Sequence, residues 1–284
     1  MIWDTVLFLF ILGAATGSFL NVLASRYSER SGFKKALHGR SHCDHCRRRL
    51  RWYELIPVFS FIFLRGRCRS CKKRIPALYT AVEVLASLLA VFVPLKIGLT
   101  PLALTWTLVF WLLLLISLID LRLKIIPDSL VVFVALLGAV NLVYRYLTGL
   151  AGSYVTTIGL DLLGHYSMVL KLGPSPLMNH LAAVMAGLVL FGGIYLLTRG
   201  RAMGLGDVKL AGALGLLVAW PDIIVVLIVP FLMGTLIGLP MMWLKKMNLK
   251  SSIPFGPFIA LGVLLTFFFG YDIVNAYFGL LNLA

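Results

Sequence analysis

Apolar runs of about twenty residues recur along nearly the whole chain, and this pattern limits the fold more than any other feature. A helix needs about 20 mainly apolar residues to cross a bilayer, and in lipid it satisfies its own backbone hydrogen bonds. The runs lack the alternation of apolar and polar residues that is typical of a membrane β-barrel. Only 13% of the 284 residues are charged, roughly half of the usual share in a soluble domain. The sequence therefore predicts an all-α polytopic membrane protein.

Eight apolar segments are long enough to count as candidate spans. They are Met1–Leu23, Leu78–Leu95, Pro101–Ile119, Ser129–Leu147, Asn179–Thr198, Leu205–Trp220, Ile223–Leu244 and Phe255–Leu280. The first has Asp4 where a secretory signal would have basic residues, so we interpret it as a permanent helix. The predicted organisation is a helix over 1–23, a loop over 24–77 and a seven-helix core over 78–284. An insertion at about 148–178 interrupts this core and could form a short interfacial helix.

Basic residues are concentrated on one side of the predicted spans. Of the 26 Lys and Arg residues, 15 lie between Arg26 and Arg74, and alternating spans place 23 on the same side. The positive-inside rule assigns that side to the cytoplasm and the N-terminus to the periplasm. A net charge of +15 can also indicate nucleic-acid binding, but one membrane-adjacent basic loop favours topology instead. We therefore expect anionic lipid head groups, and no nucleic acid, as partners of this loop. The oligomeric state cannot be predicted.

All four cysteines lie in the basic loop, as two C-x-x-C pairs formed by Cys43 with Cys46 and by Cys68 with Cys71. Two pairs separated by about 20 residues have the spacing of a tetrahedral four-thiolate zinc site. Disulfides are the alternative, but a reducing cytoplasm disfavours them. His42 and His45 could replace a thiolate, although four cysteines already complete the shell. Because four thiolates leave no open position, we expect a structural zinc that folds a loop with too small an apolar core.

Acidic residues lie at the ends of several apolar segments. Asp120 ends the third segment, Asp128 follows in the same loop, and Asp207 opens the sixth segment. Alternating spans place Asp120 and Asp207 at one depth, where two carboxylates could act as general base and general acid. Interfacial solvation beside Arg122 and Lys124, and stabilisation of Asp207 by a helix dipole, are the structural alternatives. The residues alone do not decide between them.

Two further expectations concern the charge states of these acids. Glu83 lies inside the second segment, and we expect it to pair with a neighbouring basic side chain. Asp120 closes a predicted helix, where the dipole disfavours an anion, whereas Asp207 opens one. We therefore expect Asp120 to hold a shared proton more often, although such a pair titrates as a unit.

Several motifs occur in an order that is similar to one known family. They are Gly17–Val22, the stretch Cys43–Glu83, Asp120 with Ile126–Asp128, the GxGD motif in Gly204–Lys209, and Pro254–Pro257. Together they resemble the type IV prepilin peptidases, also called prepilin leader peptidase/N-methyltransferases. The GxGD motif is shared more loosely with presenilin-like proteases. Two departures are Asp44, where a proline is common, and the long insertion at 148–178.

The resemblance implies a bifunctional enzyme of the bacterial inner membrane. It would cleave type IV prepilins and pseudopilins after a glycine at the cytoplasmic face, with Asp120 and Asp207 as the catalytic aspartates. It would then methylate the new N-terminal residue with S-adenosylmethionine. Supporting roles are implied for Asp128, Gly204, Gly206, Lys209, Glu83, Pro254 and Pro257. The sequence itself contains no strand and Gly-rich turn that would cradle S-adenosylmethionine.

Two other classes of protein compete with this interpretation. A transporter could use the two aspartates as a proton relay, but such sites usually lie near the bilayer midplane between structural repeats. Here the acids lie at one face, and no repeat is visible. A non-enzymatic scaffold built on the zinc loop is the second alternative, and it would tolerate the loss of both aspartates.

Overall fold

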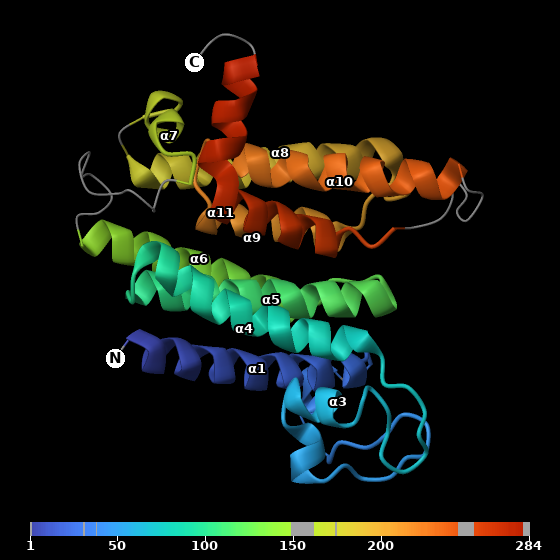
Figure 1. Cartoon of the computed structure of the whole chain (residues 1–284). Coiled ribbons are helices and arrows are strands. Elements are labelled where there is room, and N and C mark those ends of the chain that lie inside the picture. The colour runs from blue at the N-terminus through green and yellow to red at the C-terminus, as the bar shows by residue number, and fades with distance from the viewer. Residues whose placement is uncertain are drawn as a thin grey trace. The chain divides into compact units, whose positions relative to one another are not determined.

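The computed structural model describes residues 2–30, 32–37, 39–148, 162–173, 175–243 and 253–280 (Figure 1). These residues form helices and three isolated β-bridges, and no strand occurs among them. The predicted all-α class is therefore confirmed. The chain divides into two compact units, Met1–Ile119 and Asp120–Ala284, which we describe separately.

The first unit is built on the helices α1 (Ile2–Arg26), α4 (Ala77–Ile97) and most of α5 (Pro101–Leu123). Helices α1 and α4 lie side by side (Figure 1). A Cβ atom at Gly17 would lie only 2.7 Å from the Cα atom of Glu83, so the glycine is what lets the two backbones approach. Small residues have this role in many membrane helix pairs.

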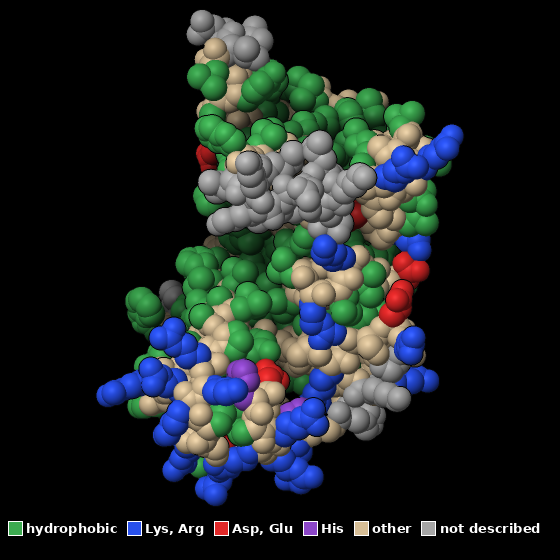
Figure 2. Space-filling model, turned by 90° about the vertical axis from the view of Figure 1, so that its right-hand side faces the viewer, with side chains coloured by type: hydrophobic (Ala, Val, Ile, Leu, Met, Phe, Trp, Pro, Cys, Tyr) green, Lys and Arg blue, Asp and Glu red, His purple; other side chains and the backbone are tan. Residues whose placement is uncertain are grey.

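The connection between α1 and α4 comprises residues 27–76, which we call the basic loop. Its short helices are α2 (Gly32–Ala36), η1 (Trp52–Leu55) and α3 (Phe59–Phe63). Many Lys and Arg side chains project from it, at the bottom of the view in Figure 2. Helix α1 continues three residues beyond the predicted end at Leu23, so the loop is slightly shorter than expected.

The second unit contains six helices among the described residues. They are α6 (Asp128–Leu147), α7 (His165–Val169), α8 (Pro176–Thr198), α9 (Leu205–Leu217), α10 (Ile223–Trp243) and α11 (Gly256–Leu280). Helix α9 packs against both α6 and α8, and α10 packs against α11. A Cβ atom at Gly215 of α9 would lie 2.4 Å from the amide nitrogen of Val184 in α8, so these backbones are in direct contact.

The described residues contain seven helices that are long and apolar enough to cross a membrane, one fewer than the sequence predicts. The difference lies in the sixth segment, Leu205–Trp220, where α9 has only 13 residues. A helix of that length extends about 20 Å, against about 30 Å for the hydrocarbon core. Val218 leaves the helical conformation, and Pro221 restricts the backbone of the residue before it, so the helix does not continue.

Part of the predicted insertion at 148–178 lies outside the described residues, namely 149–161 and 174. Its described part includes the short helix α7 and is fixed to the α9–α10 connection. The buried carboxylate of Asp222 accepts hydrogen bonds from the amide of Leu162, at 2.8 Å, and from the hydroxyl of Ser167. The indole of Trp220 donates to the carbonyl of Leu170 at 2.9 Å. These contacts give this segment a structural role.

Candidate functional site

Two buried carboxylates meet in the second unit, at the ends of helices that are distant in sequence. Asp120 lies in the last turn of α5 and is only 5% exposed, and Asp207 lies in the first turn of α9 and is 9% exposed. The two side chains are near enough for the charge of Asp120 to act on Asp207. The structure thus brings together the two aspartates that the sequence singles out.

Each of these carboxylates accepts a hydrogen bond from a backbone amide at the start of a helix. Oδ2 of Asp120 accepts from the amide of Gly256, the first residue of α11, at 2.8 Å. Oδ2 of Asp207 accepts from the amide of Gly204, which precedes α9, at 3.1 Å. Backbone donors of this kind fix the direction of a carboxylate and stabilise its charged form.

The amide of Gly256 changes one expectation. The end of α5 alone would disfavour a charge on Asp120, but the positive end of α11 now faces the same carboxylate. The carboxylate of Asp120 therefore faces the N-terminus of α11, and that of Asp207 lies at the N-terminus of α9. The expectation that Asp120 holds the shared proton more often took into account only the dipole of α5. Because the start of α11 has the opposite effect on the same carboxylate, that argument does not hold.

Glycines allow the backbone segments around the two aspartates to approach closely. A Cβ atom at Gly256 would lie 2.9 Å from Oδ2 of Asp120, and one at Gly206 would lie 2.9 Å from Cβ of Ile126. Gly206 is among the predicted supporting residues, whereas Gly256 is not, although it lies in the Pro254–Pro257 motif. A glycine between two prolines at the start of an apolar segment was the signal that could have indicated it.

Asp128 and Lys209 form an ion pair with each other, and neither hydrogen-bonds to Asp120 or Asp207 in the part of the chain that the structure describes. Asp128 is the first residue of α6, and Nζ of Lys209 in α9 lies 2.8 and 2.9 Å from its two carboxylate oxygens. Both side chains are more than half exposed, at 69% and 51%. The pair therefore joins the starts of α6 and α9. Of the remaining supporting residues, Pro254 is half-buried before α11 and Pro257 is its second residue.

Glu83 lies in the first unit, and its contacts differ from those expected. Its side chain is buried, and Oε2 accepts a hydrogen bond from the backbone amide of Val58 in the basic loop, at 2.8 Å. Among the residues that the structure describes, no basic side chain pairs with it. The predicted ion pair is therefore wrong, because a backbone donor from the loop takes its place.

The two cysteine pairs of the basic loop have the same local conformation. In the first, the Cys43 amide donates to the carbonyl of Arg48 at 3.0 Å, and the Arg47 amide donates back to Cys43 at 2.9 Å. In the second, the Cys68 amide donates to the carbonyl of Lys73 at 2.9 Å, and the Lys72 amide donates to the carbonyl of Cys68 at 3.0 Å. Arg47 and Lys72 both have positive φ angles, of 53° and 58°. Each pair thus forms a tight turn that presents two sulfurs on one side.

The four sulfurs converge on one point. All four Sγ atoms lie within 4.8 Å of one another, and those of Cys43 and Cys71 are 3.9 Å apart. A tetrahedron with zinc–sulfur bonds of about 2.3 Å has sulfur–sulfur edges of about 3.8 Å. None of the four forms a disulfide. The cluster thus fits a closed zinc site, with no need for His42 or His45.

The electrostatics of the cluster also favour a cation. The backbone amide of Cys71 lowers the pKa of the Cys68 thiol to about 7. The amide of Lys73 acts in the same direction on Cys71, but burial and the neighbouring sulfurs outweigh it and raise the pKa of that thiol to about 11. Several thiolates cannot accumulate side by side without a positive ion among them.

The fold and the two sites together define a polytopic helical membrane protein that has a pair of buried aspartates and a cluster of four cysteines. A pair of this kind can activate water and protonate a leaving group. Comparison with known proteins then gives the family. Residues 11–97 match the Bacterial Peptidase A24 N-terminal domain, and residues 107–239 match the Type IV leader peptidase family. The chain belongs to the type IV leader peptidase family and is a multi-pass inner-membrane protein.

Relatives resemble the chain over most of its length. A protein of Aeromonas hydrophila named prepilin leader peptidase/N-methyltransferase is 30% identical, and the match covers 97% of this chain and 94% of that protein. A protein of the same name from Pseudomonas putida is 29% identical, over 93% of this chain and 90% of its own. One from Legionella pneumophila is 28% identical, and the match covers 84% of this chain and 76% of that protein. No solved structure matches the chain.

Proposed function

We propose that the chain is an aspartic endopeptidase that cleaves the leader from type IV prepilins and pseudopilins after a glycine. The observation that carries the proposal is a pair of buried carboxylates, each hydrogen-bonded to a backbone amide at a helix start and near enough for one charge to act on the other. The names of the relatives support the substrate.

The chemistry follows from the two carboxylates. One is ionised and takes a proton from water while the water oxygen attacks the carbonyl carbon of the scissile peptide. The other is protonated and donates to the carbonyl oxygen. The tetrahedral intermediate then collapses, the carbon–nitrogen bond breaks, and the leaving amine receives a proton from the pair. Asp120 and Asp207 fill these two roles, and neither role is assigned to one residue.

We also propose that the chain methylates the new N-terminal residue, with S-adenosylmethionine as the methyl donor. The relatives named N-methyltransferase support this second activity. Cleavage releases a primary amine, which is the nucleophile that such a methylation requires. The order of the two reactions follows, because the amine does not exist before the peptide bond is cut.

A structural zinc completes the proposal for the basic loop. Cys43, Cys46, Cys68 and Cys71 would hold it, as their separations support. The ion would supply no open coordination position, because four thiolates fill the tetrahedron. Its contribution would be to fold the loop.

We further propose that the N-terminus is periplasmic and that the paired aspartates act at the cytoplasmic face. The distribution of basic residues supports this orientation. A cysteine placed at Lys171 should react with an impermeant reagent in the periplasm, and one placed at Arg201 only after lysis. Labelling of both from the same side would contradict the orientation.

Incubation with a synthetic prepilin tests the main proposal. The detergent-purified chain, supplied with S-adenosylmethionine, should yield a shortened product and then the same product with one added methyl group, both read by mass spectrometry. Asp207→Asn should give neither, because methylation follows cleavage. A pre-cleaved substrate should still be methylated by this variant. Cleavage by Asp207→Asn at the rate of the unchanged protein would refute the proposed chemistry.

A further inference from the structure

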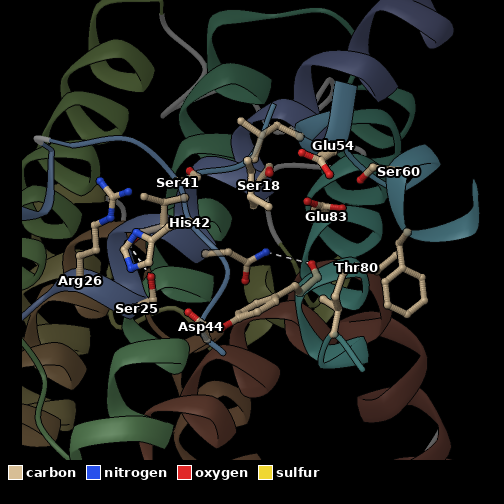
Figure 3. A pocket seen from close by; sticks show the side chains of 17 residues that line it. Ser18, Ser25, Arg26, Ser41, His42, Asp44, Glu54, Ser60, Thr80 and Glu83 are labelled. Atoms are coloured by element: carbon tan, nitrogen blue, oxygen red, sulfur yellow. Dashed lines mark hydrogen bonds between the residues drawn. The ribbon is translucent and has the colours of Figure 1, made fainter. Parts of the chain in front are cut away.

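A cavity of about 270 Å³ lies in the first unit, between the basic loop and the ends of α1 and α4 that adjoin it (Figure 3). Its volume is close to the lower end of the range of roughly 300–1,000 Å³ that is usual for small-molecule sites. Neither Asp120 nor Asp207 lines it. The cavity is therefore separate from the carboxylate pair that we propose for peptide hydrolysis.

The charges that line this cavity are the opposite of those on the surrounding loop. Its walls carry three carboxylates, from Asp44, Glu54 and Glu83, and one guanidinium, from Arg26. The loop itself is strongly basic, with 15 Lys and Arg residues between Arg26 and Arg74. Three acids around one hollow in such a loop give the cavity a cation-binding character that the loop surface lacks.

Backbone and side-chain contacts hold the polar groups of the cavity in place. Glu83 and Glu54 each accept an amide hydrogen bond, from Val58 at 2.8 Å and from Arg51 at 2.7 Å. These bonds orient both carboxylates, which lie close to each other in Figure 3. On the opposite wall, the hydroxyl of Tyr79 donates to Asp44 at 3.3 Å. The site is thus formed before a ligand arrives.

We propose that this cavity binds S-adenosylmethionine and is the site of methyl transfer. This ligand carries two positive groups, a sulfonium and an ammonium, and one carboxylate. Acids on the cavity walls match the two cations, and Arg26 matches the carboxylate. The aromatic ring of Tyr79 offers a surface for the adenine. The inference rests on the proposed methylation, and it deepens that proposal by giving the reaction a place.

Methyl transfer from S-adenosylmethionine to the new N-terminus needs only the amine of the substrate and an acceptor for one proton. The neutral amine of the new N-terminus attacks the methyl carbon, the carbon–sulfur bond breaks, and its electron pair stays on sulfur as a neutral thioether. The nitrogen then loses one proton to a carboxylate or to water. Because the product S-adenosylhomocysteine has lost the sulfonium charge, the acids of the cavity hold it less tightly, which favours its release.

A basic side chain of the substrate leader is the competing occupant. It has one positive group and no carboxylate, so it would bring a second positive charge toward Arg26 and offer the guanidinium no anion. The mixed charges of the cavity therefore favour S-adenosylmethionine over a peptide cation.

Calorimetric titration of the purified, zinc-loaded full chain separates these possibilities. We expect S-adenosylmethionine to bind more tightly than S-adenosylhomocysteine, and Glu83→Gln to weaken the former about tenfold while changing the latter little. Glutamine keeps an oxygen that can accept the Val58 amide, so the variant removes charge and retains shape. Glu54→Gln is a second variant with the same expected pattern. Glu29→Gln, an exposed acid of the same loop outside the cavity, should bind as the unchanged chain does.

Zinc content and melting temperature verify that each variant is folded. Equal affinity for S-adenosylmethionine in both folded glutamine variants and the unchanged chain would overturn the cavity assignment. A basic leader peptide that displaces S-adenosylmethionine and depends on Glu83 for its own binding would overturn it too. If the unchanged chain methylates a pre-cleaved substrate in these tests, the proposed methylation stands even when the cavity assignment fails.

Discussion

The basic loop and the paired aspartates are two polar regions that fold by different means. The loop is short, hydrophilic and nearly without an apolar core, and its geometry depends on two tight turns whose sulfurs converge within 4.8 Å. The aspartate site is assembled from helix ends, in which Asp120 accepts from Gly256, 136 residues further along the chain. On the account proposed above, zinc holds the first region together, whereas packing of apolar helices holds the second. The two regions should therefore respond to different perturbations.

Removal of the zinc ligands should have the largest effect on the loop and a small one on the aspartates. Structural zinc contributes on the order of 10–16 kcal/mol in small zinc-dependent folds, far more than other contacts of the loop. A double substitution, Cys43→Ser with Cys46→Ser, should abolish zinc binding and make the loop sensitive to protease. Metal analysis of the unchanged chain should give about one zinc per molecule, as a closed four-thiolate site requires.

His45→Ala is the matched control for this experiment, because His45 lies within the first turn but outside the sulfur cluster. It should retain the full zinc content. If the double variant contains no zinc and its loop still resists protease, then the loop does not depend on zinc for its fold, and the proposed difference between the two regions is wrong.

A methyl group at Gly256 should damage the second region and leave the first intact. In Gly256→Ala the new Cβ atom would lie 2.9 Å from Oδ2 of Asp120, so the carboxylate or the start of α11 must move. A displacement of about 1 Å at reacting groups can lower a rate by about 100-fold, and we expect a loss of cleavage of roughly 10- to 100-fold. Initial rates on a synthetic prepilin measure it.

Gly193→Ala provides the control, because nothing lies within 4 Å of a Cβ atom at that position in α8. It should cleave at the normal rate, and both glycine variants should keep their zinc. Normal cleavage by Gly256→Ala would mean that the contact between Asp120 and α11 does not matter for catalysis.

Loss of the ion pair between Asp128 and Lys209 should have the smallest effect. Exposed pairs of this kind contribute about 0.2–1 kcal/mol. Lys209→Met, Asp128→Asn and the double variant form a cycle whose coupling energy, from reversible unfolding in detergent, should fall in this range. A coupling several times larger would show that the pair supports the start of α9, and with it Asp207, more strongly than its exposure suggests.

Local patterns in the sequence predicted the loop better than they predicted the environment of the aspartates. The C-x-x-C spacing is a property of neighbouring residues, so it indicated all four sulfurs directly. The positions of Asp120 and Asp207 at helix ends also followed from the apolar runs and their alternation. The hydrogen-bond donors to Asp120 and to Glu83 could not be predicted, because the amides of Gly256 and Val58 reach these carboxylates through tertiary packing. The short α9 was missed because Leu210–Trp220 is an unbroken apolar run, whereas the helix already ends at Leu217 and Val218 has an extended backbone.

The central claim is that Asp120, and not the nearby Asp128, works with Asp207. The rates at which Asp120→Asn and Asp128→Asn cleave the same prepilin test it most directly. General acid–base groups contribute about 100- to 10,000-fold, so Asp120→Asn should lose at least about 100-fold, whereas Asp128→Asn should stay within about tenfold of the unchanged chain. Both variants should retain zinc and insert into the membrane. An inactive Asp128→Asn beside a nearly normal Asp120→Asn would contradict the account.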